Sequence, residues 1–421
     1  RIGEKLAVYP SQMPRVLAQR SINLLEKYGR KSILPMNNMD FHEMRIGNQP
    51  FQCIPDFKPA ILTKQTILRK VRKEKHMQAG KASIRFEHPP LIVSEGSVVG
   101  RKEGEGPIGH LFDRVEQDDK WGKNNWEEAE SQMQKEAVKL ALSKGGLENT
   151  DIRYLLGGDL LGQLIATSFG VMELNIPLFG LYGACSTMGE AMGLGAMLVG
   201  AGYADRVVSV ASSHFATAEK QFRFPLGYGN QRPYSATWTV TGCGAVVLES
   251  ADKMEKKNKT DLGHAMITGV TTGKIVDLGI KDSMNMGAAM APAAFSTIIQ
   301  NFEDFGVEET WYDKIITGDL GTVGRTILLD FMKEKGHNLT EIHMDCGIEI
   351  FDPKSQDTHA GGSGCGCSAV TFCSYILPRI RQGIWKRVLF VPTGALLSTV
   401  SFNEGQSVPG IAHGVVIEHR P

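Results

Sequence analysis

The chain has 421 residues, of which 42% are apolar and 22% charged, a composition typical of globular proteins and sufficient for two domains or one large duplicated one. Lysine plus arginine and aspartate plus glutamate number 46 each, so the chain lacks the global positive charge on which non-specific nucleic-acid binding depends. Its seven cysteines follow no regular spacing and no secretory leader pattern is visible, so we expect a reducing, cytosolic-type compartment.

Residues 1–80 differ in charge from the rest of the chain. They contain 15 lysines and arginines against 6 aspartates and glutamates, and the basic run LRKVRKEKH occupies residues 68–76. Two interpretations remain open: an accessory segment, or a basic arm that contacts a membrane surface or a protein partner. We predict a separate N-terminal segment over residues 1–80, whose role the sequence does not reveal.

From residue 84 onward, short β-rich runs alternate with longer helical ones, which is typical of layered α/β folds. The pattern then repeats. Each copy has an apolar strand, a Gly-Asp-Leu turn that contains Asp159 or Asp319, a Cys-Ser pair, a long helix and a buried strand. The matched blocks are 154–169 with 315–331, 183–210 with 364–391, and 239–249 with 407–418. Three blocks in the same order predict an internal duplication that pairs Cys185 with Cys367.

The most apolar segment, residues 176–204, contains Glu190 and is interrupted repeatedly by glycine, so no membrane-spanning helix is expected. Within it, Cys185 is predicted at a helix start, where unpaired backbone N–H groups stabilise a thiolate. The alternative is that Cys185 packs as a small buried hydrophobe. Zinc is disfavoured because Cys365 and Cys367 lack the usual ligand spacing. We expect neither a metal site nor, since no phosphate-binding motif is present, a nucleotide cofactor.

Residues 82–421 resemble the thiolase superfamily and, within it, the stage V sporulation protein AD family of endospore-forming bacteria. The resemblance rests on KEGEGP, GLYGACSTM, SSHFATAEKQFRFPLGYG, WTVTG, TGDLGTVG, HAGGSGCGCSA and VPGIAHGVVI, which follow one another in this order. It implies a thiolase-like fold in which two pseudo-twofold related α/β halves, 82–255 and 256–421, form α-β-α-β-α layers. It also implies a homodimer.

The same resemblance implies a function in sporulation and germination. Members of the family bind dipicolinic acid, or its calcium chelate, for uptake into the developing spore and release in germination. The implied location is peripheral, on the cytoplasmic face or outer surface of the spore inner membrane beside other SpoVA proteins. No nucleic acid is expected as a partner.

An acyl-transferring or condensing enzyme of this superfamily needs a base and an oxyanion donor beside its cysteine. Where such enzymes carry histidine in the turns of the second half, this chain has Asp319 and then Ser363. His359 and His413 lie nearby in the sequence. The first alternative is therefore a condensing enzyme or acyltransferase that uses Cys185 with one of these histidines. A subunit with a vestigial pocket is the second.

We accordingly predict a non-catalytic binding protein with no catalytic residue. Glycine-rich turns, helix starts and a long insert at residues 212–238 are expected to supply donors and flat walls for a planar dicarboxylate. The insert offers Lys220, Phe222, Arg223, Phe224, Tyr228 and Arg232 as a lid or as a dimer contact. The predicted ligand-binding residues are Cys185, Ser186, Ser213, His214, Asp319, Ser363, Cys365 and Cys367.

Overall fold

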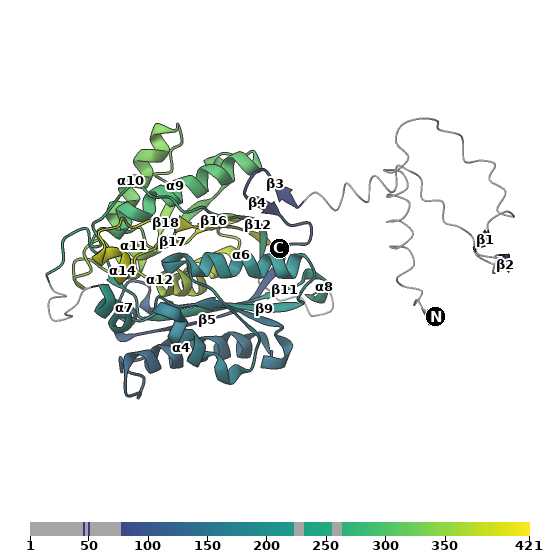
Figure 1. Ribbon diagram of the computed structural model, residues 1–421, viewed down its shortest axis with the longest axis horizontal. Helices are drawn as coiled ribbons and strands as arrows, with labels where there is room; N and C mark the ends of the chain where they lie inside the picture. The colour runs from purple at the N-terminus through teal and green to yellow at the C-terminus, as the bar shows by residue number, and fades with distance from the viewer. Residues whose placement is uncertain (1–44, 47–48, 51–76, 223–230, 255–262) are drawn as a thin grey trace. The chain divides into compact units, whose positions relative to one another are not determined.

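The computed structural model describes residues 45–46, 49–50, 77–222, 231–254 and 263–421 (Figure 1). The chain divides into two units, Arg1–Gln65 and Thr66–Pro421. In the first, an antiparallel pair of strands is described, β1 (Arg45–Ile46) and β2 (Gln49–Pro50). The basic run at residues 68–76 lies outside the described residues. Both predicted halves, 82–255 and 256–421, fall within the second unit, and the boundary between them stays a prediction.

The second unit is built on a 13-stranded mixed sheet whose main path contains two sets of five strands with the same order and direction. One set runs β8-β7-β9-β11-β5 and the other β14-β13-β16-β19-β12. In each set the first two pairings are parallel and the next two antiparallel. Ala265 pairs with Ile92 where β12 meets β5 and joins the sets. This matching topology confirms the predicted α/β class and internal duplication.

The strands of the main path have the following bounds: β5 Leu91–Val99, β7 Tyr154–Gly158, β8 Leu178–Gly180, β9 Arg206–Ser213, β11 Gly242–Glu249, β12 His264–Thr271, β13 Lys314–Thr317, β14 His343–Asp345, β16 Arg387–Val391 and β19 Gly414–Arg420. Shorter strands are β3 Gln78–Ala79, β4 Ser83–Arg85, β6 Arg114–Val115, β10 Trp238–Thr239, β15 Gly362–Ser363, β17 Thr393–Ala395 and β18 Gly410–Ala412.

Helices form layers on and between the two strand sets (Figure 1). Helix α4 (Trp126–Gly145) packs on β5 and β11, whereas α9 (Met286–Phe305) packs on the second set with α10 (Gly321–Glu334) beside it. Between the sets lie α6 (Thr187–Gly200) and α12 (Cys365–Thr371). The remaining α-helices are α3 Arg101–Gly104, α5 Ile165–Gly170, α7 Phe215–Phe222, α8 Ala251–Met254, α11 Cys346–Ile350, α13 Leu377–Arg381 and α14 Thr399–Asn403.

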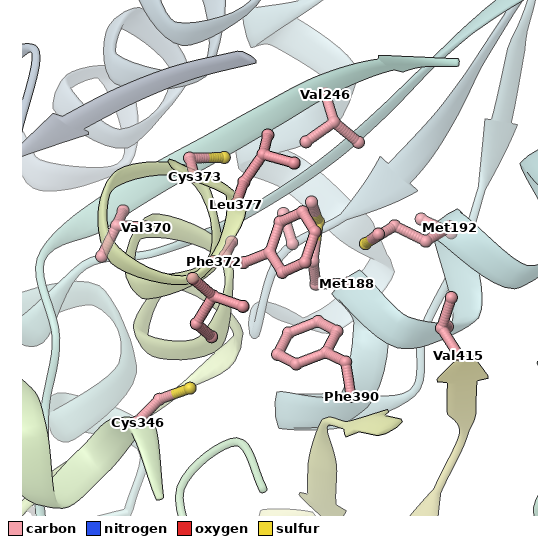
Figure 2. Close-up of a cluster of buried hydrophobic side chains, with 14 of the residues drawn as sticks. Met188, Met192, Val246, Cys346, Val370, Phe372, Cys373, Leu377, Phe390 and Val415 are labelled. Atoms are coloured by element: carbon pink, nitrogen blue, oxygen red, sulfur yellow. The ribbon is translucent and has the colours of Figure 1, made fainter. Parts of the chain in front are cut away.

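The core lies between the two halves and includes large side chains from both (Figure 2). Met188 and Met192 of α6 are fully buried, as are Phe372, which follows α12, and Phe390 of β16. The rings of Phe372 and Phe390 lie 4.8 Å apart. Burial of one such side chain contributes about 1.5–3 kcal/mol, so this layer stabilises the contact between the two halves.

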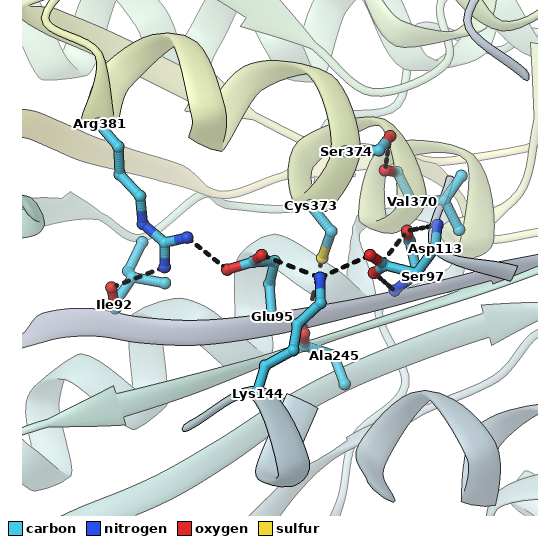
Figure 3. A network of polar contacts seen from close by, with 10 residues as sticks. All are labelled: Ile92, Glu95, Ser97, Asp113, Lys144, Ala245, Val370, Cys373, Ser374 and Arg381. Atoms are coloured by element: carbon cyan, nitrogen blue, oxygen red, sulfur yellow. Dashed lines mark hydrogen bonds and ion pairs between the residues drawn. The ribbon is translucent and has the colours of Figure 1, made fainter. Parts of the chain in front are cut away.

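A polar network also connects the halves at the edge of that core (Figure 3). Arg381 of α13 pairs with Glu95 of β5 at 2.6 Å and donates to the carbonyl of Ile92 at 3.2 Å. Lys144 at the end of α4 bridges Glu95 and Asp113 at 3.2 and 2.6 Å. Because Arg381 belongs to the second half, the network holds α13 against β5.

Candidate functional site

Cys185 lies in a 3-10 turn (Ala184–Ser186) directly ahead of α6 and is buried. Ala184 takes a left-handed φ of +49°, which non-glycine residues adopt rarely. The Ser186 hydroxyl donates to the Gly183 carbonyl at 2.7 Å and so stabilises the turn from inside. Cys367, its predicted counterpart, lies within α12, so the two cysteines do not occupy equivalent places at their helix starts.

Asp319 is the polar partner of Cys185. It follows β13, is fully buried and acts electrostatically on the Cys185 thiol. Its Oδ2 accepts the Gly364 backbone N–H at 2.9 Å, and its Oδ1 accepts the Thr393 hydroxyl at 2.8 Å. Burial raises the pKa of Asp319 to about 7 in spite of these hydrogen bonds.

Burial and Asp319 together set the protonation state of Cys185. Burial raises the pKa of the Cys185 thiol well above its usual value, and the negative charge of Asp319 raises it further. The thiolate expected from the helix-start position is therefore not favoured, because burial and Asp319 outweigh the backbone N–H groups. Cys185 is held as a neutral thiol beside Asp319, the opposite of an activated nucleophile.

The turn that carries Ser363 completes the site. Gly364 has φ +98°, and a Cβ there would meet the Ser213 hydroxyl at 2.6 Å, so the turn requires glycine. Ser363 pairs with Thr239 through the parallel strands β15 and β10. The structure thus brings together Cys185, Asp319 and Ser363 from both halves.

The cavity at Cys185 is small, about 20 Å³. Cys185, Thr239, Ser363 and Gly364 form its polar side, and it is closed by Leu160, Tyr182, Ala184, Met286, Ala395 and Leu397. A cavity of this size holds about one water molecule, whereas ligand pockets usually measure about 300–1,000 Å³. In this state of the protein the site has no room for an aromatic dicarboxylate.

Four other predicted ligand-binding residues are not among those that line this cavity. The Ser213 hydroxyl donates to the Val240 carbonyl at 2.7 Å and accepts the Gly366 N–H at 3.1 Å. His214 accepts the Ala216 N–H at Nδ1, so Nε2 carries the proton that it donates to the Asp119 carbonyl at 2.8 Å. The thiols of Cys365 and Cys367 donate to the backbone carbonyls of Ser212 and Gly318.

The two histidines of the enzyme alternative are also not among the residues that line the cavity in the described part of the chain. His359 contacts the Pro233 carbonyl at 2.9 Å and the Asp357 carboxylate at 3.1 Å. His413 accepts the Gly273 N–H at Nδ1, and burial lowers its pKa to about 4. It lines a different cavity, of about 90 Å³, with Glu190.

The insert at residues 212–238 is only partly described. Lys220 pairs with Glu127, and Arg232 donates to the Asp357 carboxylate at 3.1 Å. Arg223, Phe224 and Tyr228, and the side chain of Phe222, lie outside the described residues. Among the described residues, no cluster of three or more His, Cys, Asp or Glu side chains could hold a metal ion.

Sequence reasoning did not identify Thr393, Met286 or Leu397 as parts of the site. Thr393 and Leu397 follow β16 in the segment PTGALL, and Met286 begins α9. These residues carry no recognisable motif. Only the topology could have indicated them, because the segment after a central strand of one half returns toward the Cys-Ser turn of the other half.

The chain is similar to known proteins over most of its length. The family model of stage V sporulation protein AD matches residues 80–418. The stage V sporulation protein AD of Bacillus subtilis (strain 168) is 45% identical over 339 residues, which cover 80% of this chain and 97% of that protein.

Solved structures of the thiolase type are also similar to this chain. An OleA variant from Xanthomonas campestris matches with a TM-score of 0.52 and 12% identity, covering 79% of this chain and 97% of that one. Human mitochondrial 3-ketoacyl-CoA thiolase in complex with CoA matches with a TM-score of 0.50 and 12% identity, covering 80% and 99%. At this identity the likeness concerns the fold, which is thiolase-like as predicted.

Proposed function

The chain belongs to the stage V sporulation protein AD family, and from that premise we propose that it binds dipicolinic acid, or its calcium chelate, without catalysing a reaction. Its role would be to pass the ligand into the developing spore and to release it in germination. The fold is that of acyl-transferring enzymes, so the chemistry of the site has to decide between binding and catalysis.

The observation that carries the proposal is the pairing of Cys185 with Asp319. A condensing enzyme needs an imidazole or an equivalent group to take the thiol proton and to donate to the oxyanion. Burial and Asp319 instead keep the proton on Cys185, and both oxygens of Asp319 already accept hydrogen bonds, from Gly364 and Thr393. These contacts support a protein that retains the thiolase-like fold without its reaction.

An acyltransferase or condensing enzyme remains the second candidate, and one observation favours it. The thiol of Cys185 retains its place at the head of α6, and the Gly364 N–H lies close enough to lower its pKa, although burial and Asp319 outweigh that effect. This function would require His359 or His413 to reach Cys185 in another conformation.

Calorimetric titration with dipicolinate, with and without calcium, distinguishes the two candidates. We expect saturable binding by the full-length protein and by Cys185→Ala, since the thiol takes no part in chemistry. In parallel, the protein is incubated with acetyl-CoA and digested for mass spectrometry of the peptide that contains Cys185. An acetyl group on Cys185 together with absence of dipicolinate binding would replace our proposal with the acyltransferase.

We also propose a homodimer formed through β8. This strand ends the main path of the sheet, and Leu178 and Phe179 are 40% and 48% exposed on it. An apolar edge strand that is open to solvent invites pairing with a second copy. Sedimentation should give a dimer that Phe179→Lys dissociates and that Tyr203→Lys, at another exposed aromatic, leaves intact. A monomeric wild-type protein would contradict this proposal.

The proposed location is the spore inner membrane, on its cytoplasmic face or outer surface, through other SpoVA proteins. No helix of the described residues has the length and apolarity needed to cross a bilayer. Attachment would then depend on partners. Fractionation of wild-type spores should recover the protein with the inner membranes. In spores that lack the other SpoVA proteins, it should appear in the fraction that is free of membranes. Retention on membranes in the deletion strain would contradict attachment through these partners.

A further inference from the structure

A larger pocket lies next to the small cavity at Cys185. Its volume is about 320 Å³, and its lining includes Gln221, Ser283, Leu397, Ser398, Thr399 and Phe402. None of the described residues that line it carries a charge. Ser398 and Thr399 are exposed, so this space opens to solvent, and we name it the outer pocket. Its volume falls in the usual range of ligand pockets, which that of the Cys185 cavity does not.

The outer pocket and the Cys185 cavity share a wall. Leu397 lines both spaces and is 8% exposed. The chain on either side of it passes from one space to the other, because Ala395 lines the Cys185 cavity and Thr399 lines the outer pocket. The segment that leads into α9 does the same, with Met286 at the Cys185 cavity and Ser283 at the outer pocket. The Leu397 side chain therefore lies between a closed cavity and a pocket that is open to solvent.

Leu397 belongs to a loop that is fixed at both ends. We name residues 397–408, which connect β17 with β18, the β17–β18 loop. The two strands pair antiparallel, and the Leu396 N–H donates to the Pro409 carbonyl at 2.8 Å. At the far end of the loop, the Val408 N–H donates to the Ile280 carbonyl at 2.7 Å. The middle of the loop can therefore shift without breaking the strand pairing at its base.

The middle of this loop has few contacts with the rest of the protein. None of the residues 398–407 is buried, and Val400 and Phe402 are 66% and 49% exposed. Helix α14, which they belong to, lies at the outside of the second unit (Figure 1). Among the described residues, one hydrogen bond ties this stretch to another segment, from the Ser407 hydroxyl to Asp277 Oδ2 at 2.5 Å. Segments with so few buried contacts open at a low cost in free energy.

We propose that the outer pocket is the entrance to the Cys185 cavity and that the β17–β18 loop is its lid, with Leu397 as the side chain that closes it. Outward displacement of Leu397 joins the two spaces into one of ligand size, and Cys185 and Ser363 then face a molecule in the outer pocket. This inference rests on the proposed function only for the identity of the ligand that enters. The lid itself is tested through the Cys185 thiol.

The test is alkylation of Cys185 by iodoacetamide in the native full-length protein. Mass spectrometry follows the tryptic peptide 154–206, in which Cys185 is the one cysteine. Leu397→Ala removes the shared wall and should raise the rate roughly tenfold or more, because burial of this side chain keeps the lid closed. Leu160→Ala is the matched control, since Leu160 lines the Cys185 cavity but is not among the described residues of the outer pocket. It should leave the rate nearly unchanged.

A blocked entrance distinguishes an opened route from a loosened fold. Ser283 lines the outer pocket and lies outside the lid, so Ser283→Trp should fill the pocket and slow alkylation severalfold, in the wild type and in Leu397→Ala. Gln132→Trp, at a half-buried uncharged residue of a separate groove, should leave both rates unchanged. Acceleration by Leu397→Ala that Ser283→Trp does not reverse would overturn the entrance, because the reagent would then arrive by another route.

The hydrogen bond of Ser407 should hold the lid closed. Ser407→Ala removes this bond and changes none of the described residues that line the two spaces. The rate should rise roughly three- to tenfold, as expected for the loss of one hydrogen bond. Ser355→Ala removes a similar bond, to Asp352 at 2.7 Å on another loop, and should have no effect. Wild-type rates in both Leu397→Ala and Ser407→Ala would overturn the lid.

Protection by a ligand separates this inference from the proposed function. Saturating dipicolinate should slow the alkylation of Cys185 in Leu397→Ala, because the ligand would occupy the joined space. Alkylation that responds to Leu397→Ala and Ser283→Trp but not to dipicolinate would support the lid and count against dipicolinate as the ligand of this site. Protection by dipicolinate in a protein whose alkylation rate neither variant changes would overturn the lid and keep the proposed function.

Discussion

The pKa of Asp319 makes a quantitative prediction about stability. In the folded protein Asp319 keeps its proton up to a pKa of about 7, whereas in the unfolded chain it ionises near 3.8. The difference is about 3.2, and at about 1.36 kcal/mol for each pKa unit it corresponds to about 4 kcal/mol. Between these two pKa values the folded state binds more protons, so its stability falls as pH rises, by up to about 1.4 kcal/mol per pH unit.

Asp319→Asn should remove this dependence. The amide cannot accept the Gly364 N–H at its nitrogen, so we expect a constant loss of about 1–3 kcal/mol at low pH. From pH 5 to pH 8 the wild-type protein should lose about 2–3 kcal/mol that the variant does not lose, and the two stabilities should converge.

Urea unfolding at pH 5, 6, 7 and 8 measures the free energy of unfolding of both proteins. Other buried acids contribute equally to both, so the difference between the two profiles isolates Asp319. Asp330→Asn, an exposed aspartate on α10, is the matched control and should follow the wild type. Parallel profiles for wild type and Asp319→Asn would refute the reasoning, because Asp319 would then be ionised in the folded protein.

Three further predictions concern other parts of the molecule. Because Cys185 is a buried neutral thiol, it should react with iodoacetamide on the order of 100-fold more slowly in the native protein than in the urea-unfolded chain. Mass spectrometry follows the reaction, and equal rates in the two states would contradict a buried neutral thiol. Burial lowers the pKa of His343 to about 3, so the unfolded chain binds a proton at this residue more readily than the folded protein. The free energy of unfolding should therefore fall as pH drops below about 6.5, by up to about 1.4 kcal/mol per pH unit. His343→Gln should reduce that slope in urea unfolding. Phe390→Ala should lower the free energy of unfolding by about 3–5 kcal/mol, and a loss under 1 kcal/mol would contradict its central place in the core.

The sequence was sufficient to predict the architecture because short motifs of the first half recur in the same order in the second half. The Gly-Asp-Leu turns after β7 and β13 and the Cys-Ser turns at α6 and α12 repeat in order, and each half forms the same set of strands. The replacement of the expected histidine by Asp319 could be predicted for the same reason, because the preceding strand fixes the position of Asp319 within its turn.

The size of the site could not be predicted. Leu397, Met286 and Tyr182 close the cavity at Cys185, and each comes from a different segment without a motif. Side-chain direction could not be predicted either. Ser213 and His214 are neighbours at the end of β9, yet Ser213 accepts the Gly366 N–H whereas His214 lines a separate cleft of about 460 Å³ with Trp238. Such placements depend on packing between distant parts of the chain, which spacing in the sequence does not encode.

The hydrogen bonds beside Cys185 support the proposal that the thiolase-like fold persists here without acyl chemistry. In an enzyme, a backbone N–H in this turn would have to be free for the oxyanion of the substrate. The Gly364 N–H instead donates to Asp319, whose other oxygen accepts from Thr393, so the donor is used to join three segments of the second half. A substrate that used this N–H as an oxyanion donor would have to break these bonds and displace Leu397.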